Sequence, residues 1–132
     1  MKTSDKGKLV ITTDQNGNPQ VVFEPVDGTT WLSKSELAEL FGVYQQKINI
    51  CLGSIFRTKA FCPKEVSKYD LVVRGNTIRY DMQSFRLEII IALAFQLDSP
   101  NAEILRLWVV SRILKSGLAN FPLSDIQNYS LN

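Results

Sequence analysis

Three side-chain amides stand close together in the middle of the chain. Gln45, Gln46 and Asn49 follow Gly42, a residue that favours a turn. A side-chain amide both donates and accepts hydrogen bonds, so Gln or Asn can pair in two places with an adenine edge in the major groove of DNA. The neighbouring Ile50 offers an apolar contact for a thymine methyl group. These residue types in this order make Gln45, Gln46, Asn49 and Ile50 the candidates for contact with base edges.

Basic residues are concentrated in the same part of the chain. Residues 44 to 79 contain seven Lys and Arg against two Asp and Glu, a net charge of +5, whereas the whole chain carries +2. A local basic surface favours contact with phosphate groups, although an ordinary solvated helix with surface lysines has the same composition. The candidates for phosphate contact, which include one lysine earlier in the chain, are Lys34, Lys47, Arg57, Lys59, Arg74 and Arg79.

A pair of helices has to position these groups. Ser33 and Glu36 have the spacing of a capping box, and apolar residues follow at helical spacing up to Phe41. Gly42 ends this first helix, and Ile48 gives the second helix an apolar side chain to pack against the first. The sequence therefore predicts a helix-turn-helix over residues 31–57, with Trp31 as an apolar staple over the first turn.

A β-hairpin is predicted on each side of this helix pair. The β-branched runs that flank Asn16 and Gly17 predict an N-terminal hairpin over residues 9–24. The runs that flank Arg74 and Gly75 predict a second hairpin over residues 69–81. Because it follows the helix-turn-helix directly, this second hairpin is a candidate wing.

Residues 83–115 predict a C-terminal pair of helices. The segment from Phe85 to Leu97 is apolar on nearly all sides, so it is expected to be the central helix of the core or part of a subunit contact. Ser99 and Pro100 have the order of a helix cap and first helical residue, and this helix is expected to run to Lys115. So much apolar surface favours a homodimer through these helices. The tail over residues 118–132 is expected to be irregular or to form a short helix.

Composition sets the class of the protein. A chain of 132 residues with 45% apolar side chains predicts one α+β domain over residues 1–132. With no histidine and two cysteines, of which Cys51 is expected in the core and Cys62 in a loop, no metal site, cofactor or disulfide is predicted. No segment has the length and apolar character of a membrane span or the core of a signal peptide, so no membrane association and a cytoplasmic location are expected.

Several of these residues also match a known family. The segment Trp31-Leu32-Ser33 and the block from Leu37 to Val43 resemble the N-terminal region of the RhuM-type virulence proteins of bacteria. The order of elements is similar over residues 9 to 115, and Leu105-Arg106-Leu107-Trp108 resembles the family's Arg-x-Trp element. The resemblance implies a winged helix-turn-helix-like fold and a DNA-binding module.

The leading hypothesis is thus a non-catalytic module that binds double-stranded DNA, either transcription-regulator-like or associated with a mobile element. The alternative is a protein-interaction or oligomerisation module with the same winged fold, because Ile50 on an outward face and Gly53 one turn later also suit contact with another protein. An enzyme is not expected, since the chain has no histidine, no glycine-rich phosphate loop and no Gly-x-Ser-x-Gly motif.

Overall fold

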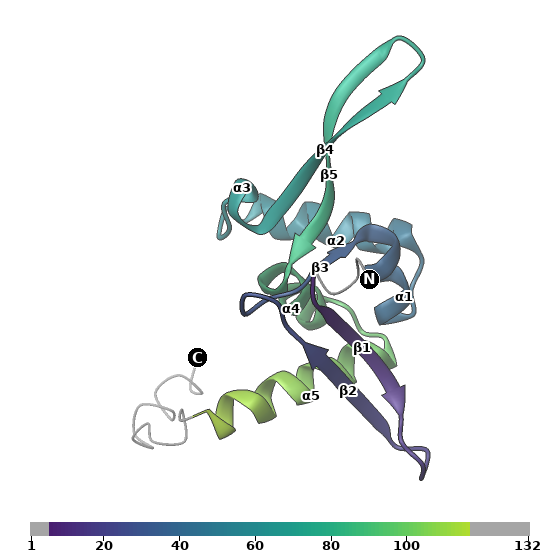
Figure 1. Cartoon of the computed structure of the whole chain (residues 1–132), viewed down its shortest axis with the longest axis vertical. Coiled ribbons are helices and arrows are strands. Elements are labelled where there is room, and N and C mark those ends of the chain that lie inside the picture. The colour runs from purple at the N-terminus through teal and green to yellow at the C-terminus, as the bar shows by residue number, and fades with distance from the viewer. Residues whose placement is uncertain (1–5, 117–132) are drawn as a thin grey trace.

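The computed structural model describes residues 6–116, which form five helices and two small antiparallel sheets (Figure 1). This is the α+β class that the sequence predicts. In chain order the elements are β1 Lys8–Thr13, β2 Pro19–Glu24, β3 Trp31–Ser33, α1 Lys34–Phe41, α2 Gln45–Arg57, α3 Pro63–Val66, β4 Ser67–Arg74, β5 Thr77–Arg86, α4 Leu87–Gln96 and α5 Pro100–Lys115.

The N-terminal hairpin predicted over residues 9–24 is present as strands β1 and β2. The two strands pair antiparallel from Lys8 opposite Glu24 to Thr13 opposite Pro19. In the turn between them, the Asp14 carboxylate accepts hydrogen bonds from two backbone amides, each at 2.9 Å. Gly17 has a φ of +82°, a conformation that glycine adopts without steric cost. Local turn chemistry therefore fixes this hairpin.

The second sheet has the strand order β3-β5-β4, so its middle strand is the last in sequence. Strand β3 pairs only with the C-terminal end of β5, where Trp31 lies opposite Arg86. Beyond this point β4 and β5 continue as a pair to Arg74 opposite Thr77 and project from the body of the molecule (Figure 1). We call residues 69–82, the part of this pair outside the three-stranded region, the distal hairpin.

Two boundaries predicted from the sequence are wrong in this sheet. The second hairpin covers residues 67–86 rather than 69–81, and Phe85, expected in a helix, lies in β5. Its fully buried ring packs beneath the sheet, and helix α4 begins only at Leu87, whose amide donates to the Thr29 hydroxyl at 3.3 Å. Trp31, expected as an apolar staple over the first turn of α1, lies in β3, where the Lys68 ammonium stands 4.3 Å from its ring centroid.

Helix α4 lies at the centre of the core. The sequence predicted either this position or a subunit contact for the apolar segment. Ile89, Ile90, Leu93 and Ala94 are fully buried and belong to a core cluster that extends from β1 to α5. The Arg106 guanidinium of α5 caps the C-terminal end of α4 by donating to the carbonyl oxygens of Ala94 and Leu97, both at 2.7 Å. One core therefore holds both sheets and the helices together.

Helix α5 has the predicted bounds from Pro100 to Lys115. The Ser99 hydroxyl accepts from the Ala102 amide at 3.2 Å, as a cap at this position should. The predicted end of the helix at Gly117 and the tail over 118–132 lie outside the described residues. Between residues 6 and 116, no helix is long and apolar enough to cross a membrane.

Candidate nucleic-acid interface

The start of α1 is fixed by the predicted capping box. The Ser33 hydroxyl accepts from the Glu36 amide at 3.2 Å, and the Glu36 carboxylate accepts from the Ser33 amide at 2.8 Å. Lys6 adds an ion pair to the same carboxylate at 2.6 Å. Partial burial raises the pKa of Glu36, but the bonds from Lys6 and Ser33 outweigh that effect and lower the pKa below its ordinary value. Glu36 therefore orients α1 in its charged form.

The turn into α2 depends on Gly42, as predicted. Gly42 has a φ of +67° in the left-handed region, and the next amide, that of Val43, donates to the Ala38 carbonyl at 3.0 Å. Because a Cβ at Gly42 would meet only the Asn101 amide nitrogen at 3.7 Å, an ordinary contact, the backbone angle rather than space favours glycine here. This turn sets the direction in which α2 leaves α1.

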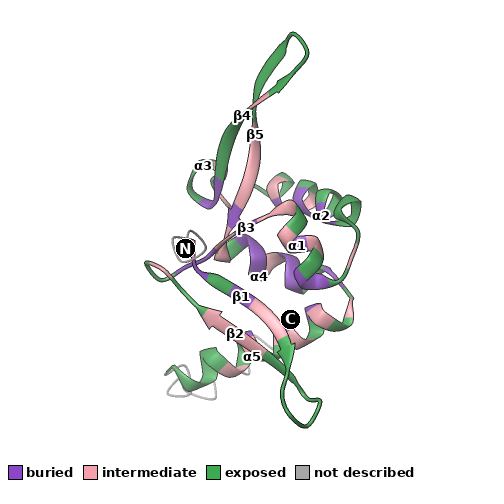
Figure 2. Cartoon of the chain, turned by 45° about the vertical axis from the view of Figure 1, so that its right-hand side comes forward, coloured by how far each residue is buried: buried purple, intermediate pink, exposed green. Residues whose placement is uncertain are grey.

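Helix α2 has a clear division between a buried and an exposed side. Four apolar residues, Ile48, Cys51, Leu52 and Ile55, face the core. All four predicted base-contact residues, Gln45, Gln46, Asn49 and Ile50, are exposed. Figure 2 shows exposed turns of α2 at the outer edge of the molecule. The structure thus leaves all four side chains accessible, with Gln46 and Ile50 on the side opposite the core and Gln45 about 100° from Gln46 around the helix axis.

The line most distant from the core is formed by Gln46, Ile50, Gly53 and Arg57, which we call the outer stripe of α2. Their spacing of three and four residues places them one above the other on a helix, opposite the buried side chains. Lys47 and Asn49 flank this stripe and are exposed. Any surface that approaches α2 from solvent meets these residues first.

Gly53 was not among the residues predicted to contact DNA; the sequence placed it one turn after Ile50 as suited to contact with another protein. Its φ is not positive, and an added Cβ would meet only the Arg57 guanidinium at 3.8 Å. Glycine inside a helix costs about 1 kcal/mol relative to alanine, so the fold itself gains nothing from it. A glycine on the outer stripe does allow another molecule to approach the helix backbone closely.

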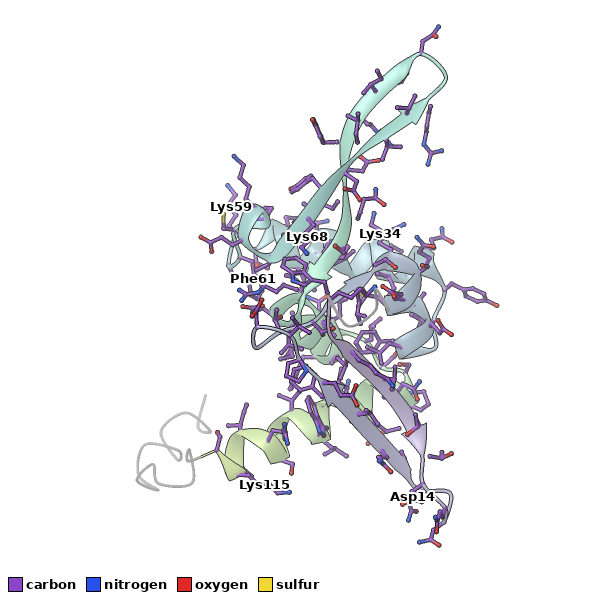
Figure 3. The ribbon with its side chains drawn as sticks, in the orientation of Figure 1. Asp14, Lys34, Lys59, Phe61, Lys68 and Lys115 are labelled. Atoms are coloured by element: carbon purple, nitrogen blue, oxygen red, sulfur yellow. The ribbon has the colours of Figure 1, made fainter. Side chains whose placement is uncertain are left out.

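The predicted phosphate contacts fall into two groups. Lys34, Lys47, Arg57 and Lys59 lie on or next to α1 and α2, and Figure 3 shows Lys34 and Lys59 on opposite sides of Lys68. Lys59 follows the end of α2 with a φ of +62°. Arg74 lies at the end of β4 beside the turn of the distal hairpin, so it does not belong to the α2 surface.

Arg79 shares the distal hairpin with Arg74 but is paired within its own strand. Its guanidinium donates to the Asp81 carboxylate at 3.1 Å, and both side chains are partly solvated. An ion pair of this kind contributes little to stability and can be exchanged for another anion. Contact of Arg79 with a phosphate would therefore replace this pair.

Two cysteines and an open cleft lie outside the outer stripe of α2. Among residues 6–116, no three His, Cys, Asp or Glu side chains form a group that could hold a metal ion. Cys51 is buried in the core and Cys62 is exposed beside Pro63, as predicted. An open cleft of about 560 Å³ is lined by residues of β1, the end of β2 and the start of α1. Of its four charged residues, Lys6 and Glu36 are paired with each other, and Lys8 and Glu24 are the other two.

Comparison of the chain with protein-family models, with curated proteins and with solved structures gives no significant match. The residues and their placement therefore carry the functional proposal.

Proposed function

We propose that this chain is a non-catalytic module that binds double-stranded DNA, with a winged helix-turn-helix arrangement in which α2 contacts the bases and the distal hairpin is the wing. The observation that carries the proposal is the division of α2, whose apolar side is buried while Gln45, Gln46 and Asn49 are all exposed. The resemblance to RhuM-type proteins favours the same function, as a bacterial transcription-regulator-like or mobile-element-associated protein.

The order of elements suits this arrangement. The short strand β3 is followed by α1 and α2, which are joined by a tight turn. The β4–β5 hairpin comes after them, and β5 lies in the middle of the sheet. In such a module the second helix of the pair enters the major groove while neighbouring elements contact the backbone. The major groove is about 12 Å wide and accepts one α-helix.

The outer stripe would carry the contacts to bases. Gln46 presents an amide that can pair with adenine, and Ile50, which is 63% exposed, presents its side chain to a thymine methyl group. Gly53 lets the helix backbone lie close to the groove. Arg57 and Lys47, on and beside the stripe, would contact phosphates on the two sides of the groove.

The salt dependence of binding tests the proposal. Each phosphate contact contributes about −0.9 to the slope of log K against log salt for duplex DNA, so affinity should fall steeply as salt is raised. Fluorescence anisotropy with labelled duplexes selected from a randomised pool measures this slope. We expect the double charge reversal Arg57→Glu, Lys59→Glu to weaken binding strongly.

Lys8→Glu, Lys115→Glu is the matched control, since both lysines are exposed and lie on β1 and at the end of α5. This double variant changes the net charge of the chain by the same amount, at positions outside α2. Equal loss of affinity in the two double variants, or an affinity that does not change with salt, would contradict the proposal.

A protein-interaction module is the second candidate, favoured by two exposed apolar side chains, one at the N-cap of α2 and one in the middle of the helix. Tyr44 is 87% exposed and Ile50 is 63% exposed. Helix α5 adds the exposed residues Leu107, Val110 and Leu114, which suit the homodimer predicted through residues 83–115. Charge reversal of Arg74 and Arg79 separates the two functions: loss of duplex binding with unchanged oligomeric state favours DNA, and unchanged binding to a protein partner favours the second candidate.

A further inference from the structure

The distal hairpin has two faces of opposite character. Residues directly opposite each other in an antiparallel pair lie on the same face of the sheet. The pairs Tyr69–Met82, Leu71–Tyr80 and Val73–Ile78 therefore form one face, which we call the apolar face. The intervening pairs Asp70–Asp81, Val72–Arg79 and Arg74–Thr77 form the other, which we call the charged face.

Nothing in the described part of the chain covers the apolar face. Its side chains other than Met82 are between 40% and 71% exposed, and Figure 1 shows the hairpin projecting away from the helices. A two-stranded hairpin by itself is marginally stable in water, and its stability depends on packing of one face. A contiguous exposed apolar face of this size is typical of a contact site.

We propose that the apolar face is the contact surface for a second copy of this chain, so that two distal hairpins pack face to face about a two-fold axis. The proposal does not depend on DNA binding, because it concerns the face of the hairpin that carries no charged residue. The charged face, with Arg74 and Arg79, stays exposed in such a dimer.

The sizes of the side chains favour a partner identical to the chain itself. The bulky residues Tyr69 and Met82 lie at the base of the hairpin, and the smaller β-branched Val73 and Ile78 lie near its tip. Consider a two-fold axis that lies in the plane between the two hairpins, at the level of the central pair and perpendicular to the strands. It places the tip of each hairpin over the base of the other. Large side chains then meet small ones, as interdigitation between two packed sheets requires.

The central pair, Leu71 with Tyr80, lies on this axis and meets its own equivalents. Tyr80 is 71% exposed, and two tyrosine rings that meet there gain from stacking beyond the area that they bury. Because neither central residue is charged, the contact of each with its own copy brings no like charges together. A self-complementary patch of this kind is what an isologous dimer needs.

The exposed area agrees with a dimer of modest affinity. If each side chain is given the full area of an aromatic one, about 200 Å², the five exposed residues of the face present at most roughly 600 Å² on each copy. Two copies would then bury at most roughly 1,200 Å² in total, the lower end of the range for specific protein contacts. The face alone therefore supplies enough area for a reversible dimer.

Sedimentation velocity of the full chain over about 1 to 200 µM, the range of micromolar dissociation constants, tests the proposal. We expect a concentration-dependent dimer. Val73→Lys, at an exposed position near the tip of the apolar face, should raise the dissociation constant about tenfold or more. Thr77→Lys is the matched control, because it adds the same charge to the neighbouring pair on the charged face and should leave the dimer intact.

Mixing two variants tests the arrangement itself. In the tip-to-base dimer Val73 of one copy faces Tyr69 of the other, so Val73→Lys and Tyr69→Glu should each be monomeric alone and should associate when mixed. Circular dichroism and thermal unfolding check that each variant is folded. Failure of the mixture to associate would overturn the tip-to-base arrangement.

Three other results would overturn the proposed hairpin dimer. A wild-type chain that stays monomeric throughout overturns the proposal. A dimer that survives Val73→Lys overturns it as well, and points to another surface such as α5. A monomer whose affinity for duplex DNA falls in Val73→Lys but not in Thr77→Lys overturns it in favour of DNA as the occupant of this face.

Discussion

Replacement of Gly53 by alanine should have opposite effects on folding and on binding. Gly53 lies inside α2 with a φ that is not positive, and the new Cβ would stand 3.8 Å from the Arg57 guanidinium, an ordinary contact. Alanine is about 1 kcal/mol better than glycine in a helix interior. We therefore expect Gly53→Ala to raise the free energy of unfolding by about 1 kcal/mol, which raises Tm by about 4 °C in a domain of this size.

Binding should change in the other direction if α2 enters the major groove. Gly53 lies on the outer stripe between Ile50 and Arg57, at the place where the backbone of α2 would be nearest to the base edges. A side chain at this position moves the helix outward and lengthens the hydrogen bonds made by Gln46. Loss of one good amide–base pair costs about 1–3 kcal/mol, so the affinity should fall about tenfold in Gly53→Ala and further in Gly53→Leu.

Fluorescence anisotropy with selected duplexes measures the affinity, and urea unfolding measures the stability of the same preparations. Ser54→Ala is the control, because it changes the next residue of α2, which is half-buried and lies off the outer stripe. If Gly53→Ala and Gly53→Leu bind duplex DNA as tightly as the wild type, then α2 does not enter the groove through its outer stripe, and the reasoning fails.

Three further predictions concern stability. Arg106→Met removes both side-chain hydrogen bonds that cap α4 and should lower the free energy of unfolding in urea by about 2 kcal/mol; an unchanged value would mean that water caps α4 equally well. Thr30→Val should raise the free energy of unfolding by about 1 kcal/mol, because the buried Thr30 hydroxyl has no hydrogen-bond partner among the described residues. A decrease in the free energy of unfolding would show that the hydroxyl does have a partner. Glu36→Gln should lower stability at neutral pH by under about 1 kcal/mol, since the Glu36 side chain is 40% exposed. Because folding lowers the pKa of Glu36, this difference from the wild type should shrink as the pH falls below the ordinary value of 4.5, and a difference that grows in acid would contradict the assignment.

The elements that the sequence predicts well are those fixed by local signals. The capping box of Ser33 and Glu36, the left-handed Gly42 and the cap at Ser99 each act over a few residues, and all three have the predicted role. The N-terminal hairpin is fixed in the same way by its turn. Such features depend on neighbours in sequence, so a reading of spacing and residue type finds them.

The errors occur where distant segments pair. Phe85 opens an apolar segment that suits a helix, but pairing with β3 and β4 holds the chain as strand up to Arg86. Trp31 lies in a strand for the same reason. Arg86 pairs with Trp31, 55 positions away, and Phe85 also pairs with Ser67, 18 positions away. Propensity gives no sign of either pairing.

The candidate site could be predicted only in part. The amides of α2 were found because exposed polar residues alternate with Ile48 and Leu52 at helical spacing. The pairing of Arg79 with Asp81 was not predicted, although residues two apart in one strand lie on the same face of the sheet. Arg106 belongs to the Arg-x-Trp element of the RhuM-type resemblance, and the structure gives it a structural role at the end of α4.

The positive charge of residues 44–79 lies mostly before the distal hairpin. The distal hairpin, residues 69–82, contains two arginines and two aspartates and has no net charge, whereas residues 44–68 contain five basic residues and one acidic residue. Most of the counterion release on DNA binding should therefore come from α2 and the segment after it, and the hairpin should add only the contacts of Arg74 and Arg79. These two arginines lie on the charged face, so contact of the wing with phosphate leaves the apolar face open to another hairpin. The two proposals thus assign different surfaces to different partners, and a chain that loses its dimer through Val73→Lys should keep the salt dependence of each monomer's binding to DNA.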